Sequence, residues 1–211
     1  MLRVLGTIKN SEYAGNFKNE QTDLIDWVLE IQDGMYQYLV RSTHPQRCIV
    51  VPSYLTTAFL PTKRSTSCFG NYPDDDTSFD DAASAALLAA TAYRLSTLAG
   101  KHKYIHLAER TRIALTARSN LGDGPSNGTF ESMVHFDADG WLSPVVNPVS
   151  FGESGSKSPE AQAFVLMMQA GYRDWAQAGY KGANTGARST APLSLATSLG
   201  VGVALALVLL R

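Results

Sequence analysis

The chain has 211 residues, of which 45% are apolar and 18% charged, and its formal net charge is −1. This composition excludes a disordered chain, the balanced charge excludes a basic surface for nucleic acid, and two cysteines are too few for a disulfide scaffold. The length suffices for one domain with a buried core. One segment departs from the average, because the twenty residues before Arg211 carry no charge.

The first part of the chain has two helical patterns. Leu2, Leu5 and Ile8 are three residues apart, which predicts the last two turns of an amphipathic helix. Apolar residues at spacings of three and four then predict a helix over 20–38 with one buried stripe.

Residues 41–70 follow no period, and they contain three prolines and both cysteines. One interpretation is a surface loop closed by a bridge between Cys48 and Cys68. The other is an inserted segment that does not belong to the fold, such as a translated intron. We favour the second, because an irregular loop of this length is uncommon inside a compact helical domain.

The clearest pattern predicts a helix over 79–98, which is rich in alanine and apolar nearly all round. This composition is typical of an inner helix with neighbours on both sides. Asp76, Thr77 and Ser78 precede it as candidate caps. A third helix is predicted over 104–118, and the connection is so short that the two helices should form a hairpin.

A last helix is predicted from Ser158 to about residue 177, with Pro159 at its first position and Glu160 beside it. The loop before it, 119–157, is punctuated by glycine and proline and contains one short predicted strand near 140–146. No ladder of strands is predicted, so the expected fold class is all-α.

The apolar tail, 193–211, is long enough to cross a bilayer as a helix. The small and polar linker before it, 181–192, gives the pair the layout of a signal for a glycosylphosphatidylinositol (GPI) anchor. Gly182 and Asn184 are the candidate attachment sites. An uncleaved membrane anchor and a buried core helix are the alternatives.

A GPI-anchored protein needs a secretory signal, and the first fifteen residues have too few apolar positions for one. We therefore expect the N-terminal part of the protein to precede Met1. A glycosylation sequon at Asn127 is consistent with secretion. The expected organisation is a domain over 1–180, the linker and the tail, and the expected location is the outside of the cell, anchored in the membrane.

The candidate functional residues lie mainly at the starts of the predicted helices. Five carboxylates lie at positions 74, 75, 76, 80 and 81, and helix capping explains two or three of them. In helical toroids the N-terminal ends of inner helices open into a central cleft, where carboxylates bind sugar hydroxyls. Asp76 and Glu160 are therefore candidates for capping and for a substrate site alike.

Two ring side chains have competing interpretations. Trp141 offers a flat apolar face to a sugar ring, although packing is the commoner use of a tryptophan in a short strand. His135 is interpreted as structural. No histidine or cysteine is interleaved with the carboxylates at ligand spacing, so neither a metal nor a cofactor is expected.

Two stretches carry a resemblance to a known family. They are NYPDDDTSFDDAASAALLAATAYRLSTL, over 71–98, and HFDADGWLSPVVNPVSFGESGSKSPEAQAFVLMMQAGYRDW, over 135–175. Together they resemble the C-terminal half of a fungal-type six-hairpin glycosidase. The group is that of the unsaturated rhamnogalacturonyl hydrolases, glycoside hydrolase family 105, related to the unsaturated glucuronyl hydrolases of family 88. The resemblance covers nearly all of 1–175 except 41–70.

The resemblance implies an incomplete (α/α)6 toroid of helical hairpins, to which this chain adds a hydrophobic C-terminal helix. It also implies hydration of the double bond in a 4,5-unsaturated uronic acid at the end of a pectin oligosaccharide. The aspartate that protonates this bond is expected before Met1, so no catalytic residue is assigned here, and the chain alone is expected to be inactive. The implied substrate-cleft residues are Asp76, Thr77, Ser78, Trp141, Ser158 and Glu160.

Two other functions stay open. The first is a non-catalytic helical protein, anchored at the membrane, that binds a carbohydrate or a partner. The second is a GPI-linked (α/α)6 hydrolase or transglycosidase of cell-wall mannan. This enzyme suits the tail but requires a pair of catalytic aspartates that the sequence does not reveal.

Overall fold

A computed structural model describes residues 1–41, 69–72, 75, 78–117 and 133–183. These residues form five helices and two antiparallel pairs of very short strands, β1 with β2 and β3 with β4. The all-α class is thereby confirmed for the described residues. In chain order the elements are α1 (Leu2–Lys9), α2 (Lys18–Arg41), β1 (Phe69–Gly70), β2 (Asp80–Asp81), α4 (Ala82–Ala99), α5 (Ile105–Leu115), β3 (Val145–Val146), β4 (Ser154–Gly155) and α6 (Pro159–Gln177).

Helix α4 is the centre of the domain, as its apolar composition predicts. Ten of its eighteen residues are buried, and it contacts α1, α2, α5 and α6. Small alanine side chains let α6 lie close against it, and Gly171 of α6 faces it so closely that an added Cβ would be 3.1 Å from the Cβ of Tyr93. The small size of alanine and glycine therefore sets the distance between α4 and α6.

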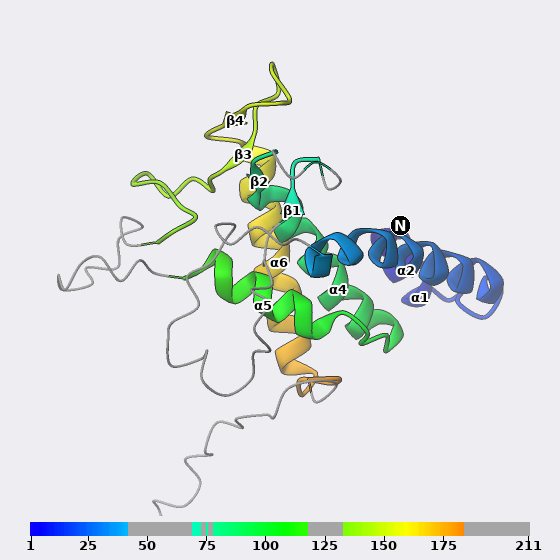
Figure 1. Ribbon diagram of the computed structural model, residues 1–211. Helices are drawn as coiled ribbons and strands as arrows, with labels where there is room; N and C mark the ends of the chain where they lie inside the picture. Colours follow the sequence, from blue (N-terminus) through cyan, green and yellow to red (C-terminus); the bar gives the residue numbers. More distant parts are fainter. Residues whose placement is uncertain (42–68, 73–74, 76–77, 118–132, 184–211) are drawn as a thin grey trace, which may run out of the picture.

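The helices alternate in direction (Figure 1). α4 and α6 begin at the same end of the molecule and run side by side, whereas α5 returns in the opposite direction, which confirms the predicted α4–α5 hairpin. Gly100 ends α4 in the left-handed conformation, with φ of +65°, and its N–H donates to the carbonyl of Ser96 over 3.0 Å. This is the usual glycine ending of a helix.

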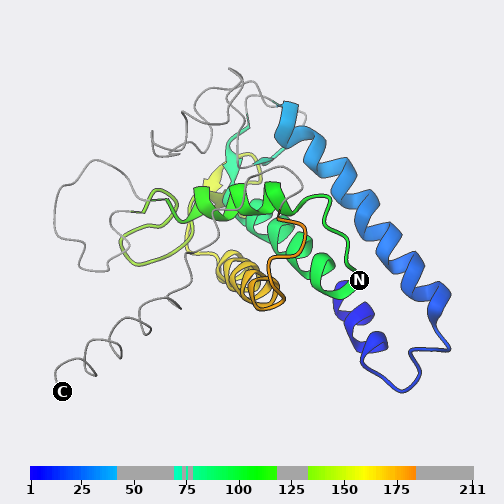
Figure 2. The same ribbon diagram turned by 90° about the horizontal axis from the view of Figure 1, so that it is seen from below.

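Helices α1 and α2 cover another side of α4 (Figure 2). Leu2 and Leu5 of α1 pack with Val28 of α2 and Leu95 of α4 in a small second core. The amphipathic pattern at the start of the chain is therefore a two-turn helix, as predicted. The second helix extends beyond its predicted bounds at both ends.

The predicted start of the alanine-rich helix is wrong by three residues. α4 begins at Ala82, and its cap is Asp81, whose carboxylate accepts hydrogen bonds from the N–H groups of Ala83 and Ser84 over 3.1 and 3.0 Å. The chain is held extended before that point, because Asp80 and Asp81 pair with Gly70 and Phe69. Because these residues pair with a segment distant in the sequence, the helix begins three residues later than predicted.

Both ends of the irregular segment 41–70 belong to the fold. Arg41 ends α2, and Phe69 is 2% exposed with its ring centroid 5.9 Å from that of Tyr36. Residues 42–68 lie outside the described residues, and so does the predicted bridge between Cys48 and Cys68. The short strand predicted at 140–146 is confined to its last two residues, which form β3.

The first residues of the predicted linker 181–192 contact the helices. The indole N–H of Trp175 donates to the carbonyl of Lys181 over 2.7 Å, and Gly182 packs against the imidazole of His102. Asn184 and the apolar tail lie outside the described residues. Within the described part of the chain, no helix is long and apolar enough to cross a membrane.

Candidate functional site

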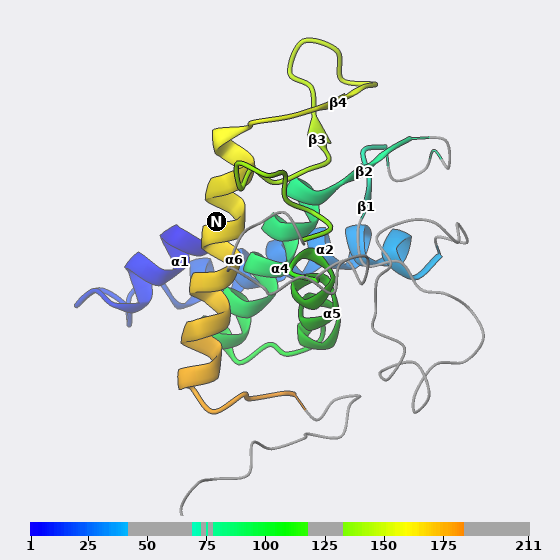
Figure 3. The ribbon, with the colours of Figure 1, turned by 90° about the vertical axis from the view of Figure 1, so that its left-hand side faces the viewer.

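The candidate site is the end of the molecule at which α4 and α6 begin (Figure 3). The segment before α4 contributes β1 and β2, and the segment before α6 contributes β3 and β4. Hydrogen bonds between described residues join the segments: the side-chain amide of Asn71 donates to the carbonyl of Phe151, and the N–H of Ala82 donates to the carbonyl of Pro144 over 3.0 Å. We call this surface, formed by the described residues of 69–81 and 133–160, the loop end.

Ser158 and Glu160 form hydrogen bonds at the start of α6. The Ser158 hydroxyl accepts from the N–H of Ala161 over 3.1 Å and donates to the Glu160 carboxylate over 2.9 Å. The backbone N–H of Glu160 and this hydroxyl lower the pKa of the Glu160 carboxyl. Glu160 is therefore a capping carboxylate that holds its charge and is unsuited to donate a proton near neutral pH.

The Ser78 hydroxyl also forms hydrogen bonds to other residues of the chain. Its hydroxyl accepts from the N–H of Tyr72 over 3.3 Å and lies 2.9 Å from the carbonyl of Asp75, to which it donates. This side chain therefore closes the turn that carries Tyr72 and is not a cap of α4. Asp76 and Thr77, the neighbours named with it, lie outside the described residues.

Trp141 sits on a tight turn that also contains Asp137 and Gly140. The Asp137 carboxylate accepts from the N–H of Trp141 over 2.8 Å, and the Trp141 carbonyl accepts from the N–H of Asp137 over 2.9 Å. Gly140 has a φ of +85°, which favours glycine at that position. The indole is half-buried, so one part packs and another part is accessible.

Gln162, which sequence reasoning missed, ties this turn to α6. Its side-chain N–H donates to the carbonyl of Gly140 and its side-chain oxygen accepts from the N–H of Leu142, both over 2.9 Å. A glutamine in the first turns of a helix gives no signal of this role, because its partners are backbone groups about twenty residues earlier.

Replacing Gln162 with alanine is expected to destabilise the loop end locally. Two backbone groups lose their partners, which costs about 1–2 kcal/mol, and hydrogen exchange at the amide of Leu142 should become faster. Gln37→Ala is the control, because the Gln37 amide bonds only the carbonyl of Gly34 on an exposed helix face. Unchanged protection of the Leu142 amide in Gln162→Ala would contradict this role.

Two exposed aromatic side chains, Tyr72 and Phe151, were also missed. They are 47% and 63% exposed, and the hydrogen bond from Asn71 to the carbonyl of Phe151 holds their two loops together. Exposed flat rings held on joined loops are suited to stack on a sugar ring or another apolar face. Their signal in the sequence is weak, because the two residues are 79 positions apart.

The loop end is acidic. Its described residues include seven carboxylates, Asp75, Asp80, Asp81, Asp137, Asp139, Glu153 and Glu160, against one lysine, Lys157. The ammonium of Lys157 is already paired with Asp139 over 3.0 Å. A ligand that lies on this surface is therefore expected to be neutral or cationic at the part that touches it.

His135 is structural, as predicted. It is 5% exposed, and its Nδ1 lies 3.2 Å from the carbonyl of Ser143, which accepts its proton. Burial lowers the pKa of His135. Burial, followed by the charge of Arg110, likewise lowers the pKa of His106.

The stability of the domain should therefore fall as the pH falls from about 7.5 to about 5.5. The unfolded chain binds protons at the ordinary imidazole pKa of 6.5, whereas the folded state keeps both rings neutral to lower pH, so protonation favours unfolding. Thermal melts at several pH values measure this. His135→Gln should flatten the slope, and a variant with the full slope would contradict the assignment to His135.

Among the described residues no group of three or more histidine, cysteine, aspartate or glutamate side chains is placed to hold a metal ion. Asn127, the predicted glycosylation site, lies outside these residues. No protein-family model, no curated protein and no solved structure matches the chain.

Proposed function

We propose that the chain is part of a glycoside hydrolase of the six-hairpin type and that the loop end lines its oligosaccharide-binding cleft. The observation that carries this proposal is the grouping of exposed aromatic rings with carboxylates where α4 and α6 begin. Stacking rings and hydroxyl-binding carboxylates are the two elements that a carbohydrate site needs.

The helix arrangement also supports the proposal. In a toroid of helical hairpins, successive inner helices are parallel and each outer helix returns between them. α4, α5 and α6 are compatible with the order inner, outer, inner, because α4 and α6 begin at one end and α5 returns (Figure 1). Closure of a full toroid requires helices beyond these.

The negative charge of the loop end indicates which sugar of the proposed substrate lies on it. An unsaturated rhamnogalacturonyl oligosaccharide has a uronate carboxylate at one end and a neutral rhamnose next to it. Seven carboxylates and one paired lysine would repel the uronate. We therefore place the neutral sugar over Tyr72, Phe151 and Trp141, and we assign these residues to binding rather than to proton transfer.

The test is a titration of the full chain with the unsaturated rhamnogalacturonan disaccharide, with mannan oligosaccharides as competitors. Tyr72→Ala and Phe151→Ala should each weaken binding roughly three- to tenfold, the effect of one aromatic stacking contact. Tyr13→Ala is the matched control, because Tyr13 is 55% exposed on the connection between α1 and α2. Equal losses in all three variants, or no saturable binding, would contradict the proposal.

Loss of the absorbance of the sugar double bond would show turnover and would support a hydrolase. Binding without turnover is expected both of the proposed part of a hydrolase, in which no proton-donating aspartate is assigned, and of the non-catalytic anchored protein. The same assay on this chain joined to the remaining helices of the toroid distinguishes these two. A preference for mannan oligosaccharides supports the cell-wall mannan enzyme. Attachment to the cell surface through the segment 193–211 is part of the same proposal, and release of the protein by a phospholipase that cleaves GPI would support it.

A further inference from the structure

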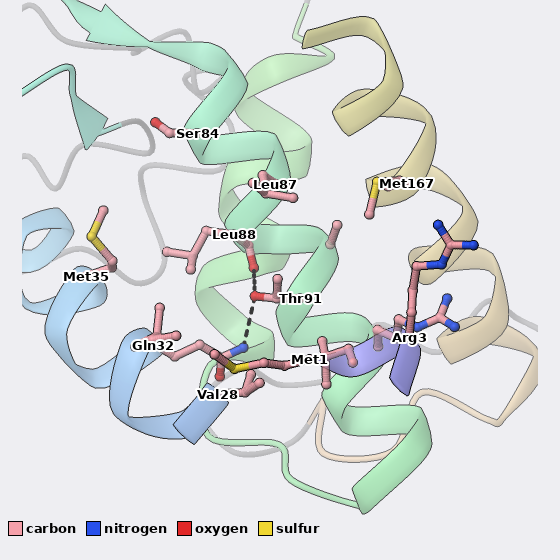
Figure 4. A pocket seen from close by; sticks show the side chains of 14 residues that line it. Met1, Arg3, Val28, Gln32, Met35, Ser84, Leu87, Leu88, Thr91 and Met167 are labelled. Atoms are coloured by element: carbon pink, nitrogen blue, oxygen red, sulfur yellow. Dashed lines mark hydrogen bonds between the residues drawn. The ribbon is translucent and has the colours of Figure 1, made fainter. Parts of the chain in front are cut away.

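A second concave feature lies away from the loops. Helices α1, α2, α4 and α6 enclose a groove of about 690 Å³ (Figure 4). Its walls are mostly aliphatic and include Leu87 and Leu88 of α4, Ile31 and Met35 of α2, and Met167 of α6. None of the described residues that line it is aromatic or acidic, so it differs in chemistry from the loop end.

The polar atoms in the middle of the groove are satisfied by one another. The side-chain N–H of Gln32 donates to the Thr91 hydroxyl over 3.1 Å, and that hydroxyl donates to the carbonyl of Leu88 over 2.7 Å (Figure 4). Because these donors already have partners, this part of the groove offers a ligand mainly apolar contact.

Two arginines, Arg3 and Arg94, line the same groove. The Arg94 guanidinium lies beside Gly6, where an added Cβ would be 3.6 Å from its Nη2. Arg3 is three residues, about one turn, before Gly6 in α1, so the two cations belong to the part of the groove where α1 crosses α4. Neither arginine forms an ion pair with another described residue.

We propose that this groove binds an amphipathic anion, an unbranched aliphatic chain with a terminal carboxylate. The aliphatic chain lies along Leu87, Leu88 and Met35, and Arg3 and Arg94 hold the carboxylate. The volume is within the range of about 300–1,000 Å³ that is typical of small-molecule sites. Charge complementarity favours an anion, because two arginines without a carboxylate partner border an apolar cavity. This inference does not rest on the proposed carbohydrate function.

The test compares decanoate with decanol, two ligands of equal chain length, by calorimetric titration of the full chain below the concentration at which micelles form. Decanoate should bind saturably with one site per chain and about tenfold more tightly than decanol, since a hydrogen bond to a charged group has this effect. Arg3→Gln combined with Arg94→Gln should abolish the difference and leave decanol binding unchanged. Both arginines are exposed, so their replacement is compatible with folding.

A pair of variants on α6 tests the location. Met167→Trp fills the groove and should weaken decanoate at least tenfold. Leu166→Trp is the matched control, because Leu166 is 70% exposed on the same helix and does not line the groove. The proposal is overturned by equal affinity for the two ligands, by an absence of saturable binding, or by a Met167→Trp variant that binds normally. The proposal is also overturned if a second copy of the chain covers the groove, which would be observed as a dimer that decanoate does not dissociate.

Discussion

Glu109→Ala is expected to lower the free energy of unfolding by about 3 kcal/mol, the largest effect of any exchange considered for this domain. Glu109 connects α5 to the centre of the fold. Its carboxylate accepts from the hydroxyl of Tyr93, which is fully buried, and from two N–H groups of Arg112, each over 3.0 Å. The Arg112 guanidinium also lies 4.0 Å above the ring centroid of Tyr172 on α6.

The physical reason for this cost is the loss of partners in a poorly hydrated place. The side chains of Arg112 and Glu109 are only 19% and 26% exposed, so water does not fully replace the bond. Burial, and then the neighbouring Glu109 carboxylate, raise the pKa of Tyr93 and keep its hydroxyl protonated as a donor. Without Glu109, a buried hydroxyl and a half-buried cation are both left without their acceptor.

Equilibrium unfolding in urea measures the change. Glu109→Gln should have an intermediate effect, because it keeps an acceptor for Tyr93 and removes the charge that faces Arg112. Asp139→Asn is the control, since Lys157 and Asp139 are 59% and 66% exposed and an exposed pair contributes little. A Glu109→Ala protein with the unfolding midpoint of Asp139→Asn would refute the central place given to Glu109.

The second large effect is a pair of glycine exchanges with opposite signs. Gly171→Ala should destabilise the domain by about 1–3 kcal/mol, because the new methyl group would meet the Cβ of Tyr93 on α4 at 3.1 Å. Tyr93 is held between Tyr172 and Trp175, with ring centroids 5.8 and 5.5 Å away, and has no room to move.

Gly34→Ala, in contrast, should stabilise the domain by up to about 1 kcal/mol. Nothing lies within 4 Å of the Cβ that would be added there, and alanine is the better helix former in the middle of α2. The two variants make the same chemical change in a helix interior, so their difference isolates packing from helix propensity. Stabilisation by both would show that α6 does not lie against α4 as described.

Local signals identified the helices well. The start of α6 was predicted because its cap is local: Ser158 accepts from an N–H group three residues ahead, and Pro159 needs no partner at the first helical position. The start of α4 was misplaced because the deciding interaction is the pairing of Asp80 and Asp81 with Gly70 and Phe69, ten or more residues away.

The candidate site shows the same division. For Glu160 the sequence left capping and substrate binding open, and the hydrogen bonds of Ser158 and Glu160 at the start of α6 show the capping role. Tyr72 and Phe151 were not found, because only the folding of their loops brings them to one surface. The groove was not found either, since its lining combines four helices from different parts of the chain.

The sequence by itself determined the helical class, the α4–α5 hairpin, the caps of local origin and the charge-free run 191–210, because each depends on residues a few positions apart or on composition. Only the tertiary structure decided that α4 and α6 begin together, that acidic loops with exposed rings meet there, and that two arginines border an apolar groove. These features depend on contacts between distant residues, whose formation is governed by the packing of whole helices and leaves no period in the sequence.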